Sequence, residues 1–357
     1  MADIIKLKRG KSEAWKRKNP VLYAGEVGVE LDTHQIKVGD GATTWNDLPY
    51  VGATAVVDKN EFSSSPAVVD GVPYQSTDVA FVQAPSGSTI RLNSNYSNSV
   101  EITKELTVDL NGNNMINNEI TPIAVGIDGK LTIKGQGTIE CNKNGNPALL
   151  NNGDTTIANG KFQRTVDVSG NGYYTAVNHN NMVINGGMFM SGGSFSSMIQ
   201  NGYWDYTSTD PAKGHVDGIN AEMPTMTIND GAFAGGLYAI KNDDNGVLNI
   251  NGGAFYNTIL ANGKSMTITD GYFENNKPSA GEYNLYLRKL SDTINVQNTY
   301  ISGGTFITAQ DKNFKVEGEP YIEISGGRFN RELDPSYLAP GYKQVLINGF
   351  YTVQKEE

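Results

Sequence analysis

The sequence predicts an all-β protein whose main body, from about residue 100 to residue 330, is a right-handed parallel β-helix with coils of roughly 22 residues. Two observations carry this prediction. A six-residue pattern, Ile-x-x-Gly-x-Phe, returns along the chain, and the residues before each isoleucine alternate between apolar and polar. Repetition of this kind indicates a solenoid, because each coil can bury its apolar face only against its neighbours.

The repeated pattern occurs seven times, and its phenylalanines are separated by 27, 44, 22, 18, 33 and 23 residues. The interval of 44 is twice the basic coil, and the interval of 33 fits one coil with an insertion of about ten residues. A degenerate copy, Ile133 to Ile139, precedes the first full one. The full copies are Ile157/Gly160/Phe162, Ile184/Gly187/Phe189, Ile228/Gly231/Phe233, Ile250/Gly253/Phe255, Ile268/Gly271/Phe273, Ile301/Gly304/Phe306 and Ile324/Gly327/Phe329.

Each residue type in the pattern has a physical reason. The alternation in 226–228 and 248–250 predicts short strands with one buried face. Glycine supplies a positive φ for a sharp corner, after which the phenylalanine points inward. Stacked coils place like residues over one another at ~4.8 Å per rung. The asparagines beside the corners, Asn185, Asn229 and Asn251, are expected to adopt the left-handed backbone conformation.

Other repeat architectures fit the pattern less well. Leucine-rich repeats need a leucine ladder, whereas this chain repeats isoleucine, glycine and phenylalanine. Propeller blades need about 40–50 residues per repeat. The density of glycine and β-branched residues argues against helical repeats.

Four segments are predicted: an N-terminal module (residues 1–50), a linker (51–71), the β-helix (72–333) and a C-terminal cap (334–357). The module stands apart by charge. Residues 1–20 hold seven Lys/Arg against two acidic residues, a net charge of +5. Because the net charge of the whole chain is −10, the remaining residues carry −15. Such an asymmetry marks a separate functional unit.

Local signals predict elements at both ends of the chain. A helix is expected over Ser12–Lys18 with Ser12 as its N-cap, and Gly39-Asp40-Gly41 is expected to be a simple turn. Asn348-Gly349 between apolar strands predicts a two-residue hairpin that covers the last rung. The expected strands are Glu26–Leu31 and Gln35–Val38 in the module, Thr89–Leu92 and Leu106–Leu110 in the first coils, and Lys343–Ile347 and Phe350–Val353 in the cap.

The order and spacing of several motifs in residues 4–50 carry a family resemblance. They include Lys6-Leu7-Lys8-Arg9-Gly10, Asn19-Pro20-Val21-Leu22, Gly25-Glu26-Val27-Gly28 and Lys37-Val38-Gly39-Asp40-Gly41, with Trp15, Glu30, Asp32-Thr33, Trp45 and Leu48-Pro49-Tyr50. This segment resembles the small N-terminal domain of bacteriophage tail fibres and receptor-binding proteins. The resemblance covers about an eighth of the chain. It implies a homotrimer, attachment to other virion proteins through the module, and a variable β-rich body.

Composition excludes several classes of partner. The net charge of −10 argues against nucleic acid, because phosphate neutralisation needs Lys and Arg. No apolar run approaches the ~20 residues of a membrane span, so no membrane insertion is expected. The N-terminus lacks the apolar core of a secretory signal, and Cys141 is the only cysteine. A virion protein at the particle surface, made in the host cytoplasm without a signal peptide, fits these features.

Candidate chemistry is sparse. His34, His179 and His215 have no metal-ligand spacing, and no cofactor, metal site or catalytic residue is assigned. Asp230 and Asp270 share a corner position in rungs two apart, which puts them roughly 10 Å from each other. That separation approaches the ~6.5–9.5 Å of inverting glycosidases. The competing reading is that both aspartates only form turns, since glycine holds the same position in other coils.

The best candidate surface is the insertion in the 44-residue interval, at residues 200–224. Exposed aromatic rings stack on sugar faces, and neighbouring carboxylates bond to hydroxyls. The alternative is that the aromatic residues only pack the loop onto the solenoid. A second insertion, at 277–298, could flank it. The candidate glycan- or receptor-binding residues are Tyr203, Trp204, Asp205, Tyr206, His215 and Asp217.

Three functions remain open at this point. The first is a structural bacteriophage fibre, trimeric, that contributes to attachment to host cell-surface polysaccharide. The second is a tailspike-like polysaccharide depolymerase, and the third is a bacterial surface adhesin. The N-terminal resemblance favours the two phage functions. The turn positions of the aspartates favour the fibre over the depolymerase.

Overall fold

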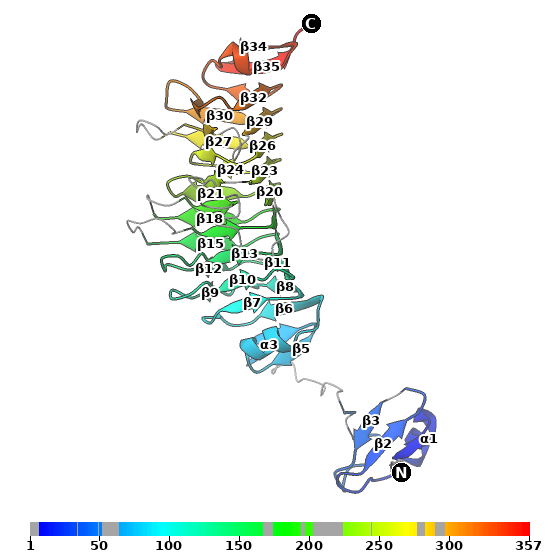
Figure 1. The fold of residues 1–357 in the computed structure, drawn as a ribbon. Helices are drawn as coiled ribbons and strands as arrows, with labels where there is room; N and C mark the ends of the chain where they lie inside the picture. The colour runs from blue at the N-terminus through cyan, green and yellow to red at the C-terminus, as the bar shows by residue number, and fades with distance from the viewer. Residues whose placement is uncertain are drawn as a thin grey trace, which may run out of the picture. The chain divides into compact units, whose positions relative to one another are not determined.

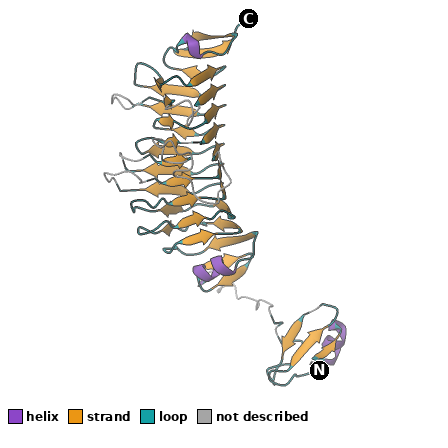
Figure 2. Ribbon diagram, viewed as in Figure 1, coloured by secondary structure: helices purple, strands orange, loops and turns teal. Residues whose placement is uncertain are grey.

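The computed structural model describes residues 7–33, 35–48, 50–51, 64–166, 174–193, 197–202, 224–243, 245–276, 283–289 and 297–357. The chain forms two compact units, residues 1–63 and 64–357 (Figure 1). Each has its own core of buried apolar residues. Figure 2 shows that strands dominate both units and that helices are short and few.

The N-terminal unit is a small three-stranded sheet with one helix. Strand β1 (Lys8–Gly10) pairs parallel with β2 (Val27–Glu30), which pairs antiparallel with β3 (Ile36–Val38). The helix α1 (Ser12–Lys18) lies between β1 and β2 in the chain and ends at Asn19, whose backbone is left-handed at φ 40°. The expected helix and hairpin are confirmed.

The start of α1 differs from the expectation. Lys11 is the N-cap residue, and its side chain makes no capping hydrogen bond, whereas Ser12 is already helical. The carboxylate of Asp32 takes over the capping role: it accepts hydrogen bonds from the backbone N–H and the hydroxyl of Ser12, both at 2.8 Å. A carboxylate at a helix N-terminus satisfies free N–H groups and complements the helix dipole. Because Asp32 is twenty residues away, local sequence gave no sign of it.

Two tryptophans form the core of this unit. The rings of Trp15 and Trp45 stack at 4.0 Å between centroids, and Leu22 packs with them. Two glycines permit this packing. A Cβ on Gly28 would lie 2.4 Å from the Trp45 ring, and one on Gly39 would lie 2.4 Å from the Leu22 side chain.

The larger unit is a parallel β-helix with three long sheets, as predicted (Figure 1). Each sheet contributes about one strand to each coil, and consecutive coils pair in parallel register. The nine-stranded sheet contains β7 (Val100–Ile102), β10 (Ile123–Val125), β13 (Leu149–Asn151), β16 (Ala176–Asn178), β19 (Ile199–Asn201), β22 (Ile240–Asn242), β25 (Ile259–Ala261), β28 (Leu285–Arg288) and β31 (Phe314–Glu317).

The other two sheets carry the isoleucines and phenylalanines of the pattern. The twelve-stranded sheet contains β4 (Ala67–Val69), β5 (Val72–Tyr74), β6 (Ser88–Leu92), β8 (Glu105–Asp109), β11 (Lys130–Lys134), β14 (Asp154–Ile157), β17 (Asn181–Ile184), β20 (Thr225–Ile228), β23 (Val247–Ile250), β26 (Ser265–Ile268), β29 (Asn298–Ile301) and β32 (Tyr321–Ile324). The eleven-stranded sheet contains β9 (Met115–Ile116), β12 (Thr138–Glu140), β15 (Lys161–Arg164), β18 (Met188–Ser191), β21 (Ala232–Gly235), β24 (Ala254–Phe255), β27 (Tyr272–Asn275), β30 (Thr305–Thr308), β33 (Arg328–Phe329), β34 (Tyr342–Ile347) and β35 (Phe350–Lys355).

The predicted phenylalanine ladder is confirmed. Seven rings, from Phe162 to Phe329, stack through the solenoid with centroids 4.5 to 5.1 Å apart and planes within 4° to 9° of parallel. All are buried. The degenerate copy also holds its place, because Ile133 pairs with Ile157 and Ile139 with Phe162.

The corner asparagines do not have the expected backbone. Positive φ occurs instead at the glycine of each pattern copy, such as Gly187 at 99° and Gly253 at 94°. Asn229 donates its side-chain amide to Asn185 at 2.7 Å, and Asn251 donates to Asn229 at 2.9 Å. These asparagines therefore form an exposed hydrogen-bonded ladder outside the corner.

The interval of 44 residues is a single coil. Strand β18 pairs directly with β21, so Phe189 is opposite Phe233 with no coil between them. The extra residues are therefore one long insertion, and the agreement with twice 22 was a coincidence.

Both ends of the solenoid are covered. At the start, β4 and β5 form a hairpin and α3 (Thr77–Gln83) places Phe81 in the core. Strand β4 falls within residues 51–71, which the sequence assigned to a linker, because its apolar side chains join the solenoid core. At the end, β34 and β35 form the predicted hairpin, and β35 pairs with the last rung through β33. The short helix η1 (Pro335–Tyr337) lies just before this hairpin.

Candidate functional site

One face of the solenoid differs from the others in how it is built. From β11 to β33, every connection from the twelve-stranded to the eleven-stranded sheet has three residues. The connections that flank the nine-stranded sheet vary much more: the one from β16 to β17 has two residues (179–180), and the one from β19 to β20 has 23 (202–224). Variation in coil length is thus concentrated beside one sheet.

Several outward side chains of the nine-stranded sheet are buried. Gln200, Leu260 and Tyr286 are 2%, 3% and 7% exposed. On the twelve-stranded sheet, outward threonines such as Thr156 and Thr227 are partly exposed. Outward residues of other strands of the nine-stranded sheet, such as Glu101 and Lys241, are exposed or half-buried. The buried outward positions therefore mark only part of this face.

A polar cluster lies near the middle of this face. Asp243 is buried; it forms a 2.7 Å ion pair with Lys241 and accepts a 3.1 Å hydrogen bond from Gln200. Burial raises the pKa of Asp243, and the Lys241 charge opposes that shift. The side chain of the buried Asn262 also lowers the pKa of Asp243.

Aromatic and charged side chains follow on the next coils of the same face. The ammonium of Lys315 lies 4.1 Å from the centre of the Tyr286 ring and 2.9 Å from the Glu317 carboxylate. The Tyr238 ring is 6.3 Å from that of Tyr286. Arg288 also approaches Glu317, at 3.4 Å. Rings and charged groups in this combination suit the apolar faces and hydroxyls of a sugar.

Under this face runs a buried ladder of asparagines that the sequence analysis did not find. Asn151, Asn178, Asn201 and Asn242 occupy successive coils, and each passes its side-chain amide to the next at 2.7 to 2.8 Å. All four are fully buried. The ladder fixes the register of the strands that carry the outward residues. Its signal was present in the sequence, because each asparagine stands two residues after an apolar residue of a three-residue strand.

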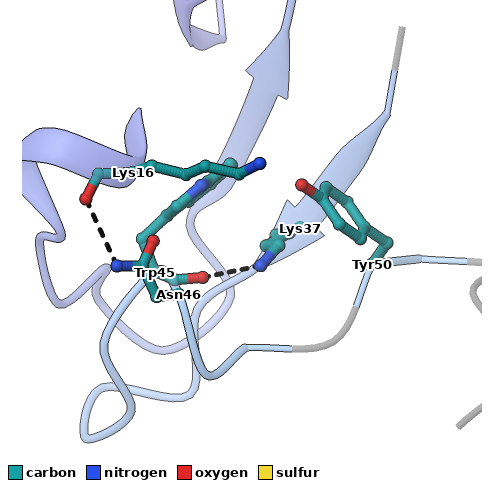
Figure 3. Close-up of a pocket in the computed structure, with 5 residues that line it drawn as sticks. All are labelled: Lys16, Lys37, Trp45, Asn46 and Tyr50. Carbon is teal, nitrogen blue, oxygen red and sulfur yellow. Dashed lines mark hydrogen bonds between the residues drawn. The ribbon is translucent and has the colours of Figure 1, made fainter. Parts of the chain in front are cut away.

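The N-terminal unit holds a pocket of about 340 Å³ (Figure 3). Lys16, Lys37, Trp45, Asn46 and Tyr50 line it. The Lys37 ammonium donates a 2.7 Å hydrogen bond to the backbone oxygen of Trp45 and lies 4.3 Å from the centre of the Tyr50 ring. Burial lowers the pKa of Lys37, with the charge of Glu30 opposing.

Comparison with known proteins gives one finding for this unit. Residues 5–43 match the family model of the major tropism determinant N-terminal domain. The N-terminal unit contains a phage tropism domain. The resemblance drawn from the motifs in residues 4–50 is confirmed, and the match indicates a bacteriophage tropism protein associated with the virion. No curated protein and no solved structure matches the chain.

The tropism domain does not contain the residues that the sequence singled out for binding. Tyr203, Trp204, Asp205, Tyr206, His215 and Asp217 all fall in 203–223, outside the described residues. That segment follows β19 of the nine-stranded sheet, and Gln200 lies in that strand. The candidate insertion therefore starts at the nine-stranded sheet, but the structure does not test these six residues.

The aspartates considered for catalysis have a structural role. Asp230 and Asp270 are exposed, and each accepts a hydrogen bond from the backbone N–H of the glycine that follows it, at 2.7 and 2.8 Å. This favours the turn-forming reading. His179 contacts Asn152 at 2.9 Å, and Cys141 is buried.

No group of three or more His, Cys, Asp or Glu among the described residues could hold a metal ion. No helix in this described part of the chain is long and apolar enough to cross a membrane.

Proposed function

We propose that the chain is a bacteriophage fibre protein that its tropism domain anchors to the virion and whose solenoid presents the nine-stranded face to glycans on the host surface. The match of residues 5–43 carries the proposal. The concentration of insertions beside one sheet supports the recognition half, because binding residues tend to lie on loops above a rigid scaffold.

The surface of the N-terminal unit supports assembly. Val21, Tyr23, Leu31, Val38 and Val51 are large apolar residues that are 40% to 79% exposed. So many exposed apolar side chains in about fifty residues indicate a protein-protein interface. A homotrimer and a neighbouring virion protein would together cover this surface.

The trimer has a direct test. Light scattering of the full chain at micromolar concentration should give a mass near three times 38.6 kDa. Three copies would let weak single-site binding add up through avidity. A monomer under these conditions would contradict the trimer but not the virion anchor.

Recognition is tested by separating stability from adsorption. Replacing Tyr203, Trp204 and Tyr206 together with alanine should leave the melting temperature unchanged and abolish adsorption to host cells. A control triple substitution on the outward face of the twelve-stranded sheet, Thr132, Thr156 and Thr227 to alanine, should change neither. A lower melting temperature of the aromatic variant would instead support packing of these residues onto the solenoid.

A further inference from the structure

The pocket of the N-terminal unit collects positive charge. Two of its five lining residues are lysines, and no acidic residue lines it. Asn46 adds an amide, which donates to the backbone oxygen of Lys16 at 3.2 Å. Figure 3 shows the two lysine side chains and the Tyr50 ring arranged around the same hollow.

Lys37 is buried without an ion-pair partner. Its residue is only 4% exposed, and no carboxylate among the described residues lies within ion-pair distance of its ammonium. The ammonium has three donors. Its hydrogen bond to Trp45 leaves two of them without an acceptor among the described residues. A buried cation in this state is costly unless an anion or another acceptor reaches it.

The neighbouring carboxylates are already engaged. Glu30 is fully buried and accepts hydrogen bonds from the hydroxyls of Tyr50, at 2.7 Å, and Thr33, at 2.5 Å. Asp47 accepts a 2.6 Å hydrogen bond from the Thr44 hydroxyl. Both act on Lys37 only through their charge. Neither Glu30 nor Asp47 is among the residues that line the pocket.

The rings limit what else can enter. The Lys37 ammonium lies over Tyr50 and, at 5.2 Å, over Trp45, so one side of the cation is covered by aromatic faces. The indole N–H of Trp45 is buried and has no hydrogen-bond partner. A volume of about 340 Å³ admits a small planar anion together with the alkyl part of the side chain that carries it. A carboxylate, with two oxygens that accept several hydrogen bonds, matches these donors.

We propose that this pocket is a carboxylate-binding site that takes an aspartate or glutamate side chain of the protein next to this one on the virion. The inference rests on the proposed role of the tropism domain as the virion anchor. Local charge favours a partner with acidic groups, because residues 1–20, which include Lys16, carry +5, although residues 1–63 as a whole are neutral. Lys16 guides the incoming carboxylate at the rim, and Lys37 receives it inside.

The first experiment measures binding of a defined probe to the full chain. The probe is fluorescently labelled, N-acetylated tetraglutamate, followed by anisotropy at low salt. Lys37→Met and Lys16→Met should each weaken its binding roughly tenfold, since each removes a charge-assisted hydrogen bond. The matched control is Lys18→Met, which changes the same charge on the same helix but does not line the pocket. It should weaken binding less than twofold.

Folding must be separated from binding. With Trp204 replaced by phenylalanine, tryptophan fluorescence reports only on the stacked Trp15 and Trp45, so the fold of each variant can be checked directly. Lys37→Met could disturb that core, but Lys16 is exposed and its substitution leaves the fold intact. If folded Lys16→Met binds the probe as tightly as the unmodified chain does, the pocket is not the site.

The second experiment uses particles that lack this fibre. The pocket variants should fail to attach, whereas Lys18→Met should attach. If they attach while a chain without residues 1–63 does not, the pocket inference falls and the anchor role stands. If the chain without residues 1–63 also attaches, the proposed anchor is wrong. Tighter probe binding in Asp58→Asn or Glu61→Gln would mean that this chain fills its own pocket, which overturns the assignment to a partner.

Discussion

The two units of this chain bury their cores in opposite ways. The N-terminal unit depends on single contacts that occur once, such as the stack of Trp15 on Trp45 and the capping of α1 by Asp32. The solenoid repeats one contact many times, with seven phenylalanines in one column and four asparagines in another. A unique core constrains motif order, and this is the part of the chain that a family model matches. A repeated core constrains only a spacing, so the solenoid can accept long insertions and new surfaces.

The largest expected effect breaks the column of rings. Phe255→Ala removes a fully buried ring that stacks on Phe233 at 4.7 Å and on Phe273 at 5.0 Å. The substitution should cost ~3–5 kcal/mol of the free energy of unfolding of the solenoid, as for other buried phenylalanines. Circular dichroism in denaturant, to which the strands of the solenoid contribute most of the signal, measures this loss. With Trp204 replaced by phenylalanine, the fluorescence of Trp15 and Trp45 in the N-terminal unit should keep its unfolding midpoint. A shift of both transitions would contradict the independence of the two cores.

The next effect breaks the buried asparagine ladder. Asn178→Ala removes an acceptor from Asn151 and a donor to Asn201, and each neighbour left unsatisfied should cost about 1–3 kcal/mol. The matched control is Asn229→Ala in the exposed ladder, where water replaces the lost partner and the change should stay within about 0.5 kcal/mol. Equal effects in the two ladders would show that burial does not set their energies.

These repeated columns also explain what the sequence could predict. The isoleucine and phenylalanine strands were predictable because glycine fixes their separation, as in Ile250, Gly253 and Phe255. The nine-stranded sheet was not, since its outward positions include Val177 and Leu260, which conceal the alternation of apolar and polar residues. The asparagine ladder was overlooked because asparagine also recurs at the corners.

In the N-terminal unit the helix, the hairpin and the family were predictable, but the pocket was not. The alternation in β3 would place Ile36 and Val38 inward and Lys37 outward. The structure reverses this: Lys37 is buried and Val38 is 40% exposed. Trp45 and Tyr50, which come later in the chain, supply the carbonyl and the ring that surround the ammonium. Contacts that occur only once have no repeat to reveal them.

The third prediction concerns the single contacts. Gly28→Ala adds a Cβ 2.4 Å from the Trp45 ring, which cannot move without disturbing its stack on Trp15. Overpacking of this kind should destabilise the N-terminal unit by about 1–3 kcal/mol. With Trp204 replaced by phenylalanine, tryptophan fluorescence follows the unfolding of this unit in urea. The solenoid transition in the same sample is the internal control, and it should keep its midpoint.

The smallest effect is a dependence on pH confined to one turn. Asp40 accepts hydrogen bonds from the backbone N–H groups of Ala42 and Thr43, at 2.9 and 2.7 Å, and from the Thr43 hydroxyl. These bonds lower the pKa of Asp40 to about 2 from its usual 3.8. The folded state therefore holds the charged form more strongly than the unfolded state does.

A pKa that is lower in the folded state sets the sign of this prediction. The stabilisation by Asp40 is complete above pH 3.8 and is lost as the pH falls toward 2, because the unfolded chain takes up its proton first. The N-terminal unit should then unfold at lower urea concentration at pH 2.5 than at pH 5. Other carboxylates contribute to acid unfolding, so the informative quantity is the difference between the unmodified chain and Asp40→Asn, whose side chain does not titrate. That difference should shrink as the pH falls, and a difference that is constant from pH 5 to pH 2.5 would mean that the turn is held by its glycines and not by the charge of Asp40.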